Sequence, residues 1–230
     1  MIKQAAARLR TKAIVKKAGL SFEELKQINA KWGVHEQSGK RMIALAAAIG
    51  FLALLRYSDL AVINIGGIYF TEEGVLICIP VRKNSQIYPT WCCIADTKHE
   101  HSVVNRLKAC IRELLPKCVI PTCGVIHTRE YLFRDVVKAT GHNHAHKRYD
   151  IVDPSFYAGQ RAMGKKAYSH YLVRFQEALH DCCGMKTQAT RLFGTHSFRS
   201  GGDTHLFNMG MTASQRCDIG RWASALVERG

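Results

Sequence analysis

The sequence lacks the cysteine spacing of a zinc-binding or disulfide-stabilised protein. Nine cysteines occur among 230 residues, yet no C-x-x-C motif is present. Cys92-Cys93 and Cys182-Cys183 are adjacent pairs, and four residues separate Cys118 from Cys123. We therefore expect no metal site and reduced thiols, several of them small core residues, in an intracellular protein.

A hydrophobic run long enough to cross a membrane is also missing. The longest apolar run covers 42–55 and is flanked by Lys40, Arg41 and Arg56, whereas a spanning helix needs roughly 20 apolar residues. The N-terminus is basic and alanine-rich, without the sustained apolar core of a secretory signal. These absences predict a buried helix at 42–55, no membrane partner, and a nuclear or cytoplasmic location.

Acidic residues are scarce, since 18 Asp and Glu stand against 33 Lys and Arg, which gives a formal net charge of +15. Such an excess favours a polyanionic partner, of which nucleic acid is the commonest and an anionic membrane the second. Part of the charge lies at the start of the chain, where no acid precedes Glu23. Residues 1–20 are therefore either a solvated tail or a basic arm that lies along phosphates.

The hydrophobic pattern predicts two helices, a small antiparallel sheet and then further helices. Ser21 is a good N-cap for the first helix, and the second helix is apolar nearly all round, as expected at the centre of a domain. Without an internal repeat, this order indicates one mainly helical α+β domain. The expected helices span 22–32, 40–56, 101–115, 165–181 and 196–210, and the expected strands span 61–65, 75–81 and 88–95.

A long loop is predicted for 140–164, which contains several glycines and a proline. His142, His144 and His146 alternate within it. Alternate residues of a flexible segment do not enforce a coordination geometry, so we interpret them as solvated rather than as metal ligands.

Several chemistry-bearing residues stand far apart in the sequence. Arg56 ends the apolar helix, and Lys83 lies at the tip of the expected hairpin. His196 and Arg199 form an H-x-x-R at a helix start, and Trp222 follows a second short helix. Taken singly, a cation at a helix C-terminus and a lysine at a turn have ordinary structural explanations.

Taken together and in this order, the motifs resemble the catalytic domain of the tyrosine recombinases, also called phage integrases. Closest in character are the Xer-like recombinases of eukaryotic DIRS-type and Crypton-type mobile elements. The resemblance covers 21–230 and implies that family's catalytic-domain fold, with a three-stranded antiparallel sheet, preceded at 1–20 by a basic arm or the remnant of a core-binding domain. The matching motifs are LLRYSDL around Arg56 and Asp59, RKNSQ around Lys83, GTHSFRSGG around His196 and Arg199, and GRWAS around Trp222.

The resemblance implies a site that cleaves and rejoins DNA strands through a 3′-phosphotyrosine. Arg56, Lys83 and Arg199 would contact the DNA. The two guanidinium groups would each donate two hydrogen bonds to the non-bridging oxygens of one phosphodiester. Lys83 would protonate the departing 5′ oxygen.

Three further residues would support this chemistry by the same resemblance. His196 would assist proton transfer, Trp222 would support the phosphate, and Asp59 would hold the pocket in shape. No metal or other cofactor is needed, because the phosphotyrosine keeps the energy of the broken bond. The implied partner is double-stranded DNA, bound by a homotetramer on paired sites.

The sequence departs from the family at the nucleophile. The family's tyrosine follows the position of Trp222 closely and would fall just past Gly230, whereas the last tyrosine of the sequence is Tyr171. We therefore expect a catalytic domain that is incomplete at its C-terminus and inactive alone. The alternative is an inactive recombinase-derived protein or a helix-turn-helix regulator that inserts 200–222 into the major groove.

Overall fold

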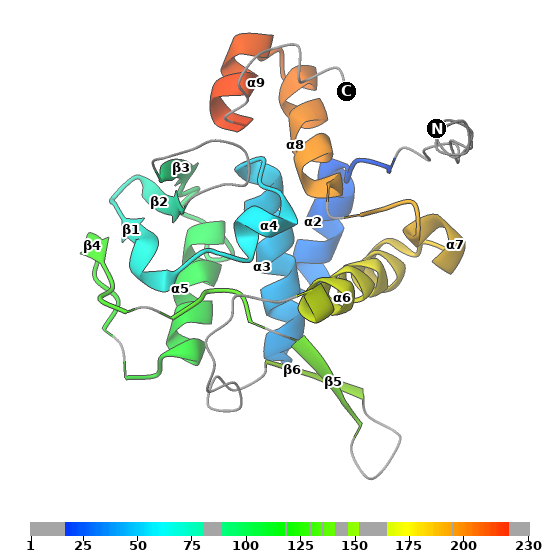
Figure 1. Ribbon diagram of the computed structural model, residues 1–230, viewed down its shortest axis with the longest axis horizontal. Coiled ribbons are helices and arrows are strands. Elements are labelled where there is room, and N and C mark those ends of the chain that lie inside the picture. Colours follow the sequence, from blue (N-terminus) through cyan, green and yellow to red (C-terminus); the bar gives the residue numbers. More distant parts are fainter. Residues whose placement is uncertain are drawn as a thin grey trace, which may run out of the picture.

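The molecule is mainly helical, with a small antiparallel sheet at one side (Figure 1). The computed structural model describes residues 17–80, 89–117, 119–128, 130–134, 136–140, 147–151, 165–194 and 196–220. The helices are α2 (Phe22–Lys31), α3 (Ser38–Leu52), α4 (Tyr57–Leu60), α5 (Val103–Leu114), α6 (Lys165–Cys183), α7 (Thr187–Thr190), α8 (Ser197–Asn208) and α9 (Ala213–Gly220), with the 3₁₀ turn η1 (Ile65–Gly67). The strands are β1 (Ile68–Phe70), β2 (Gly74–Ile79), β3 (Thr90–Ala95), β4 (Gly124–Val125), β5 (Val136–Thr140) and β6 (Lys147–Ile151). The predicted α+β class is confirmed.

Helix α3 forms the centre of the molecule. Its side chains from Met42 to Phe51 are all buried, and α2, α5, α6 and α8 pack against it. The sheet and α5 lie on one side of α3, and α6 and α7 lie on the other (Figure 1). The apolar run is therefore a core helix, and none of the helices described above combines enough length with enough hydrophobicity to span a lipid bilayer.

The first helix begins where its capping residue predicts. Ser21 Oγ accepts the backbone N–H of Glu24 at 3.2 Å, and the Glu24 carboxylate accepts the backbone N–H of Ser21 at 2.7 Å. This reciprocal pair is a capping box, which satisfies two donors that a helix N-terminus otherwise leaves unpaired. The helix ends at Lys31, and the following Trp32 is completely buried in the core.

The small sheet is antiparallel, as predicted, and has the strand order β3-β2-β1-β4. β2 and β3 pair from Gly74 with Ala95 to Ile79 with Thr90, which confirms the second and third predicted strands. β4, only two residues long, adds a fourth strand beside β1, so the three-stranded prediction was one strand short. A two-residue strand has no hydrophobic alternation by which the sequence could reveal it.

The predicted strand at 61–65 is wrong, because these residues form a turn and the start of η1. The Asn64 side chain accepts the backbone N–H of Gly66 at 2.8 Å. Such an asparagine turn competes with a strand for the same backbone groups. The strand therefore starts at Ile68, as β1, seven residues after the predicted start.

The predicted loop at 140–164 is corrected in part, since its residues 147–151 form β6. This strand pairs with β5 in an antiparallel hairpin. Its sequence, KRYDI, is rich in charge and lacks the apolar alternation of a half-buried strand. The three histidines at 142, 144 and 146 lie outside the described residues.

Residues 17–20 are bound along the start of α8, far away in the sequence. The backbone N–H of Leu20 donates to the carbonyl of Ser197 at 2.9 Å, and Ser197 Oγ donates to the carbonyl of Ala18 at 2.5 Å. A Cβ on Gly201 would lie 1.8 Å from the carbonyl oxygen of Leu20. The close approach therefore requires glycine at 201.

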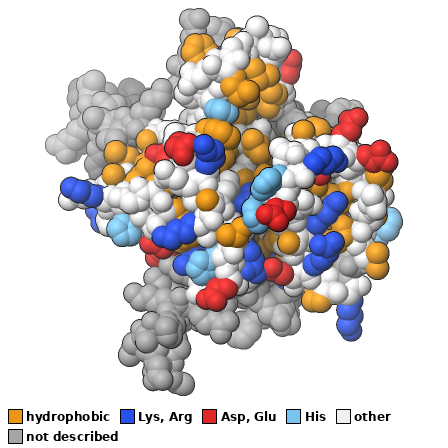
Figure 2. Space-filling view, turned by 180° about the vertical axis from the view of Figure 1, so that it is seen from behind, with side chains coloured by type: hydrophobic (Ala, Val, Ile, Leu, Met, Phe, Trp, Pro, Cys, Tyr) orange, Lys and Arg blue, Asp and Glu red, His pale blue; other side chains and the backbone are white. Residues whose placement is uncertain are grey.

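Charges of both signs share the face behind that of Figure 1. Figure 2 shows Lys and Arg side chains there interspersed with Asp and Glu, with small hydrophobic areas between them. This face therefore presents a mixed pattern rather than a field of one sign.

Candidate phosphate-binding site

The chain leaves the central helix through a strained turn that places Arg56 at the start of α4. Leu54 adopts the left-handed region with a φ of 51°, which is uncommon for a residue with a Cβ. The backbone N–H of Leu55 donates to the carbonyl of Gly50 at 2.9 Å. The prediction that Arg56 ends the apolar helix is wrong, because α3 ends at Leu52 and Arg56 is the N-cap residue of α4.

Asp59 fixes the backbone of Arg56. Its carboxylate accepts the backbone N–H of Arg56 at 2.9 Å, and its side chain is buried, with 5% exposed. A carboxylate in the first turn of a helix also lies at the positive end of the helix dipole. The structure therefore gives Asp59 a definite contact in support of Arg56.

The guanidinium of Arg56 retains an unsatisfied donor. Its Nε atom is buried and has no hydrogen-bond partner among the described residues. A buried N–H without an acceptor costs about 1–3 kcal/mol. An anion bound at Arg56 would supply the missing acceptor.

The start of α8 positions the second arginine. His196 is the N-cap residue and is partly exposed, whereas Ser197, Phe198 and Arg199 are buried. The Phe198 ring packs edge-on against Phe175 of α6, with centroids 4.6 Å apart. Because Ser197 and Phe198 are buried, they fix the directions in which the side chains of His196 and Arg199 leave the helix.

The imidazole of His196, at the start of α8, is influenced by the charged side chains at the start of α4. This pKa is lowered from the ordinary 6.5, first by partial burial and then by the positive charges of Arg56 and Arg199. The carboxylate of Asp59 acts in the opposite direction. Because electrostatic influence weakens with distance, we treat these four residues as one group, here called the arginine pocket.

The arginine pocket has the composition of an anion site. It joins two permanently charged guanidinium groups to an imidazole that is mainly neutral at pH 7, and its carboxylate already accepts a backbone N–H. Guanidinium forks match the geometry of phosphate oxygens, and a neutral imidazole can accept a proton. The pocket can therefore bind a phosphodiester and assist proton transfer beside it.

Two predicted site residues, Lys83 and Trp222, lie outside the described residues. The structure thus brings Arg56, Asp59 and the H-x-x-R pair together and leaves the other two predictions as they stand. Lys83 belongs to the connection between the paired strands β2 and β3.

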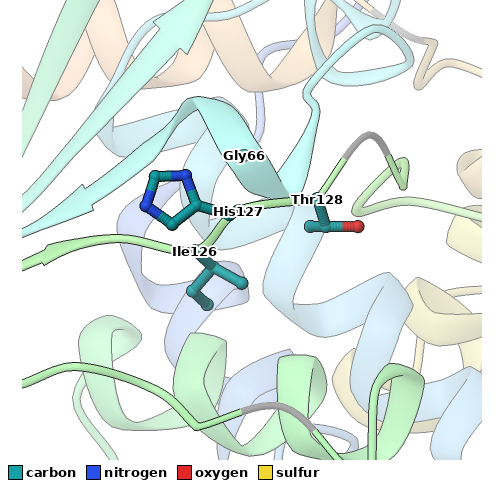
Figure 3. A pocket seen from close by; sticks show the side chains of 4 residues that line it. All are labelled: Gly66, Ile126, His127 and Thr128. Atoms are coloured by element: carbon teal, nitrogen blue, oxygen red, sulfur yellow. The ribbon is translucent and has the colours of Figure 1, made fainter.

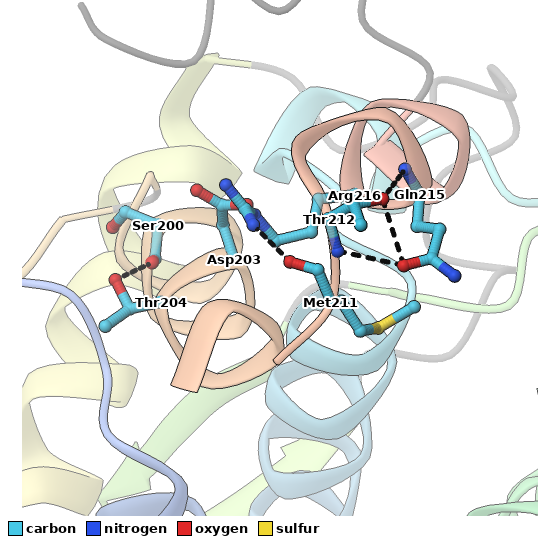
Figure 4. Close-up of polar contacts among 7 residues, drawn as sticks. All are labelled: Ser200, Asp203, Thr204, Met211, Thr212, Gln215 and Arg216. Carbon is cyan, nitrogen blue, oxygen red and sulfur yellow. Dashed lines mark hydrogen bonds and ion pairs between the residues drawn. The ribbon is translucent and has the colours of Figure 1, made fainter. Parts of the chain in front are cut away.

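An ion pair between α8 and α9 escaped the sequence analysis. Arg216 Nε donates to Asp203 Oδ1 at 3.0 Å, and Arg216 Nη1 donates to the carbonyl of Met211 at 2.6 Å (Figure 4). Arg216 is 7% exposed, and its guanidinium carbon lies 5.0 Å from the centroid of the Phe207 ring. No sequence signal identifies the pair, because its members belong to different helices.

A separate shallow depression lies between η1 and the segment after β4. Gly66, Ile126, His127 and Thr128 line it, and its volume is about 350 Å³ (Figure 3). Among the residues that the structure describes, its lining includes no arginine or lysine and no residue of α4 or α8. It is therefore distinct from the arginine pocket.

The last tyrosine of the sequence is buried in the core. The ring of Tyr171 lies 5.3 Å from that of Tyr57, and its hydroxyl donates to the carbonyl of Ile43 at 3.4 Å. Burial first, and then Tyr57, raise the pKa of Tyr171 well above its ordinary value. A buried hydroxyl held in this way is not suited to attack DNA.

The sequence matches no protein-family model and no curated protein. Its structure matches that of the XerH site-specific recombinase bound to a palindromic difH substrate, with a TM-score of 0.55 and 14% identity over 93% of this chain and 49% of that one. It also matches the FLP recombinase in a Holliday junction complex, with a TM-score of 0.50 and 11% identity over 97% of this chain and 48% of that one. The chain therefore spans about half the length of these proteins, and its mainly helical α+β fold resembles that of a tyrosine recombinase catalytic domain.

Proposed function

We propose that this chain is the DNA-binding catalytic core of a site-specific tyrosine recombinase or integrase. The observation that supports the proposal is the convergence of Arg56 with His196 and Arg199, from α4 and α8, within a recombinase-like fold. A net charge of +15 fits a DNA partner. Further parts of the proposal are a nuclear location, an origin in a mobile element of the DIRS or Crypton type, and a tetramer on paired sites.

In this proposal the arginine pocket holds the phosphodiester that is cleaved. Negative charge grows on the non-bridging oxygens in the transition state, and preorganised guanidinium donors stabilise it there. Arg56 and Arg199 supply these donors, and Asp59 holds Arg56 by its backbone. Lysine could not replace either arginine, because an ammonium lacks the planar fork.

The covalent step needs a tyrosine hydroxyl. Its oxygen attacks phosphorus, the bond from phosphorus to the 5′ oxygen breaks, and a 3′-phosphotyrosine and a free 5′ hydroxyl result. His196 assists removal of the tyrosine proton, Lys83 protonates the 5′ oxygen, and Trp222 supports the phosphate. Because Tyr171 is buried in the core and its hydroxyl is bonded to the carbonyl of Ile43, we propose that it is not this nucleophile.

A second candidate is a catalytically inactive, recombinase-derived DNA-binding protein, which the burial of Tyr171 favours. A helix-turn-helix regulator is less consistent with the geometry. Such a regulator presents its second helix to the major groove, yet the cation in the described part of α9, Arg216, points into α8. The exposed side chains of α9 include Ser214, Gln215 and Asp218.

Rejoining chemistry distinguishes the two candidates without a protein nucleophile. The substrate is a nicked duplex with randomised flanks, in which the 3′ end carries a p-nitrophenyl phosphodiester and the next strand begins with a 5′ hydroxyl. The 5′ oxygen attacks phosphorus, the bond to the p-nitrophenyl oxygen breaks, and p-nitrophenolate leaves. We expect this chain to seal the nick, with release of the coloured product, and sequencing of the sealed strands reports the preferred site.

The controls separate the pocket from general charge. Arg199→Ala and Arg199→Lys should each reduce sealing by at least about a hundredfold, because both remove the guanidinium fork. Arg112→Ala, which removes an exposed cation of α5, should leave the rate within about twofold, since one distant charge affects binding only slightly. Binding of the pool by folded protein without sealing of any sequence would contradict catalysis and favour the inactive DNA-binding protein.

A further inference from the structure

Arg199 belongs to α8, but its guanidinium also donates a hydrogen bond to α9. Its Nη2 atom donates to the carbonyl oxygen of Gly220 at 3.1 Å. The carbonyls of a helix point towards its C-terminal end, where partial negative charge collects and attracts cations. The orientation of Arg199 therefore depends on where α9 lies.

The position of α9 depends in turn on Arg216. This residue is bonded to Asp203 of α8 at 3.0 Å and to the carbonyl of Met211 in the turn at 2.6 Å. The side chains of the pair are only 8% and 20% exposed. A largely buried pair of this kind strongly resists the loss of one partner, because the other charge would remain desolvated.

Further contacts also hold α9, among them the burial of Cys217. The described part of the helix, Ala213–Gly220, has eight residues, and a helical segment of this length depends on tertiary contacts. Its first turn is capped by Thr212 and Gln215, with Thr212 N to Gln215 Oε1 at 2.9 Å (Figure 4). Gly210 has a φ of 84°, which favours glycine, and the backbone N–H of Met211 donates to the carbonyl of Leu206 of α8 at 3.1 Å.

We infer that the Asp203–Arg216 pair is a positioning element for Arg199, which docks α9 so that the Gly220 carbonyl orients the guanidinium within the arginine pocket. The inference rests on the proposed function only for the identity of the bound anion. Neither Asp203 nor Arg216 touches the anion in this account.

His196 provides a reporter that needs no DNA. Arg199 lowers the pKa of this imidazole, together with burial and Arg56 and against Asp59. If Asp203→Asn releases α9, Arg199 moves away and the pKa of His196 rises. Loss of the negative charge of Asp203 by itself would act in the opposite sense, so an upward shift reports movement of Arg199.

The experiment is a pH titration of the histidine ring resonances by NMR in the full chain. Arg199→Gln defines the largest upward shift, and we expect Asp203→Asn to give a smaller shift in the same direction. Glu177→Gln is the matched control, because it breaks the Arg174–Glu177 pair of α6, which has a 2.8 Å separation and side chains 12% and 28% exposed. This control should leave the His196 titration unchanged.

A second variant, Arg216→Lys, tests the same contact with a change that is less disruptive to folding. Arg216→Lys keeps a cation near Asp203 but cannot also reach the carbonyl of Met211, so we expect a smaller upward shift in a folded protein. An unchanged His196 titration in folded Asp203→Asn and Arg216→Lys proteins would overturn the inference. Failure of nick sealing by the unmodified chain would instead count against the proposed function and leave this titration result intact.

The inference also predicts a catalytic effect. In the sealing assay, Asp203→Asn should reduce the rate about tenfold to a hundredfold, as expected for a small misplacement of a catalytic group. Glu177→Gln should not change the rate. Equal loss in both variants would show that the Asp203 effect is only general destabilisation and would contradict a positioning role.

Discussion

At the scale of single residues, the arginine pocket is a place where positive charges lie close together. Two guanidinium groups and the carboxylate of Asp59 influence one imidazole, and the carboxylate accepts the backbone N–H of Arg56. This arrangement is unfavourable in the folded chain, because it lowers the pKa of His196 and leaves the buried Nε of Arg56 without a hydrogen-bond partner among the described residues. Ionisable groups with perturbed pKa values are typical of binding and catalytic sites.

The lowered pKa of His196 predicts a loss of stability in acid. Because the folded pKa lies below the ordinary value of 6.5, the unfolded chain binds the proton first as the pH falls. The contribution of His196 is therefore complete above 6.5 and is lost as the pH falls through 6.5 and then through the folded pKa. The free energy of unfolding would be measured by urea denaturation at about pH 7.5 and about pH 5.5. Its decrease between these two pH values should be smaller for His196→Gln than for the unmodified chain.

His35 is the internal comparison for this prediction. Its pKa is also lowered, first by burial and then by Lys40, but it lies in the segment between α2 and α3. His35→Gln should therefore reduce the acid sensitivity separately, and the two effects should add because the sites are independent. An identical acid sensitivity in His196→Gln and the unmodified chain would contradict the described environment of His196.

At the scale of elements, the site depends on how α8 is held at its start. Residues 17–20 lie along it through the hydrogen bonds of Leu20 and Ser197. α3 packs against α8 from the core side, where a Cβ on Gly202 would lie 2.2 Å from the carbonyl oxygen of Phe51. Gly201 and Gly202 thus allow the backbones of 17–20 and of α3 to approach the start of α8, which carries the H-x-x-R motif.

Gly201→Ala should therefore be severely destabilising. The new methyl group would lie 1.8 Å from the carbonyl oxygen of Leu20, so either 17–20 detaches or α8 shifts. We expect a loss of about 2–4 kcal/mol in the free energy of unfolding, as for other overpacked or strained core sites, and release of 17–20 should appear as faster amide exchange at Leu20. Thr204→Ala, at an exposed position of the same helix, is the control and should cost less than about 1 kcal/mol.

The same elements show what the sequence could predict. The cap at Ser21 and the apolar run of α3 are local signals, and both led to the correct helices. Arg56 was assigned to the wrong helix end, because the break at Leu54 arises from a left-handed residue that has no local signature. The Asp203–Arg216 pair and the bonds of 17–20 join distant or separate elements, so only the folded chain reveals them.

The site itself was predictable in part for the same reason. The residue types and their order identified Arg56, His196 and Arg199 as candidates, but their proximity depends on how α4 and α8 each pack against α3. Sequence order could not show that Asp59 bonds the backbone of Arg56, or that α9 bonds Arg199. These contacts depend on tertiary packing rather than on local propensity.

At the scale of the whole molecule, the account joins a recombinase-like fold to an excess of positive charge. Charge alone gives salt-dependent attraction to any DNA, because each neutralised phosphate releases counterions. We propose more specifically that Arg56 and Arg199, which are brought together only by folding, bind the same phosphodiester.

A double-mutant cycle on DNA affinity tests this claim most directly. Dissociation constants for a mixed-sequence duplex would be measured for the unmodified chain, Arg56→Gln, Arg199→Gln and the double variant, over a range of salt concentrations. Arg112→Gln combined with Arg199→Gln forms the control cycle, since Arg112 is an exposed residue of α5. Thermal melts of each variant would verify that it is folded.

The account predicts that each pocket variant lowers the slope of log affinity against log salt by about one. It also predicts that Arg56 and Arg199 are coupled by about 1 kcal/mol or more, because residues that share one partner are not additive. The control cycle should be additive. Additive losses for Arg56 and Arg199, or affinities and slopes unchanged by either variant, would contradict a shared phosphate in the arginine pocket.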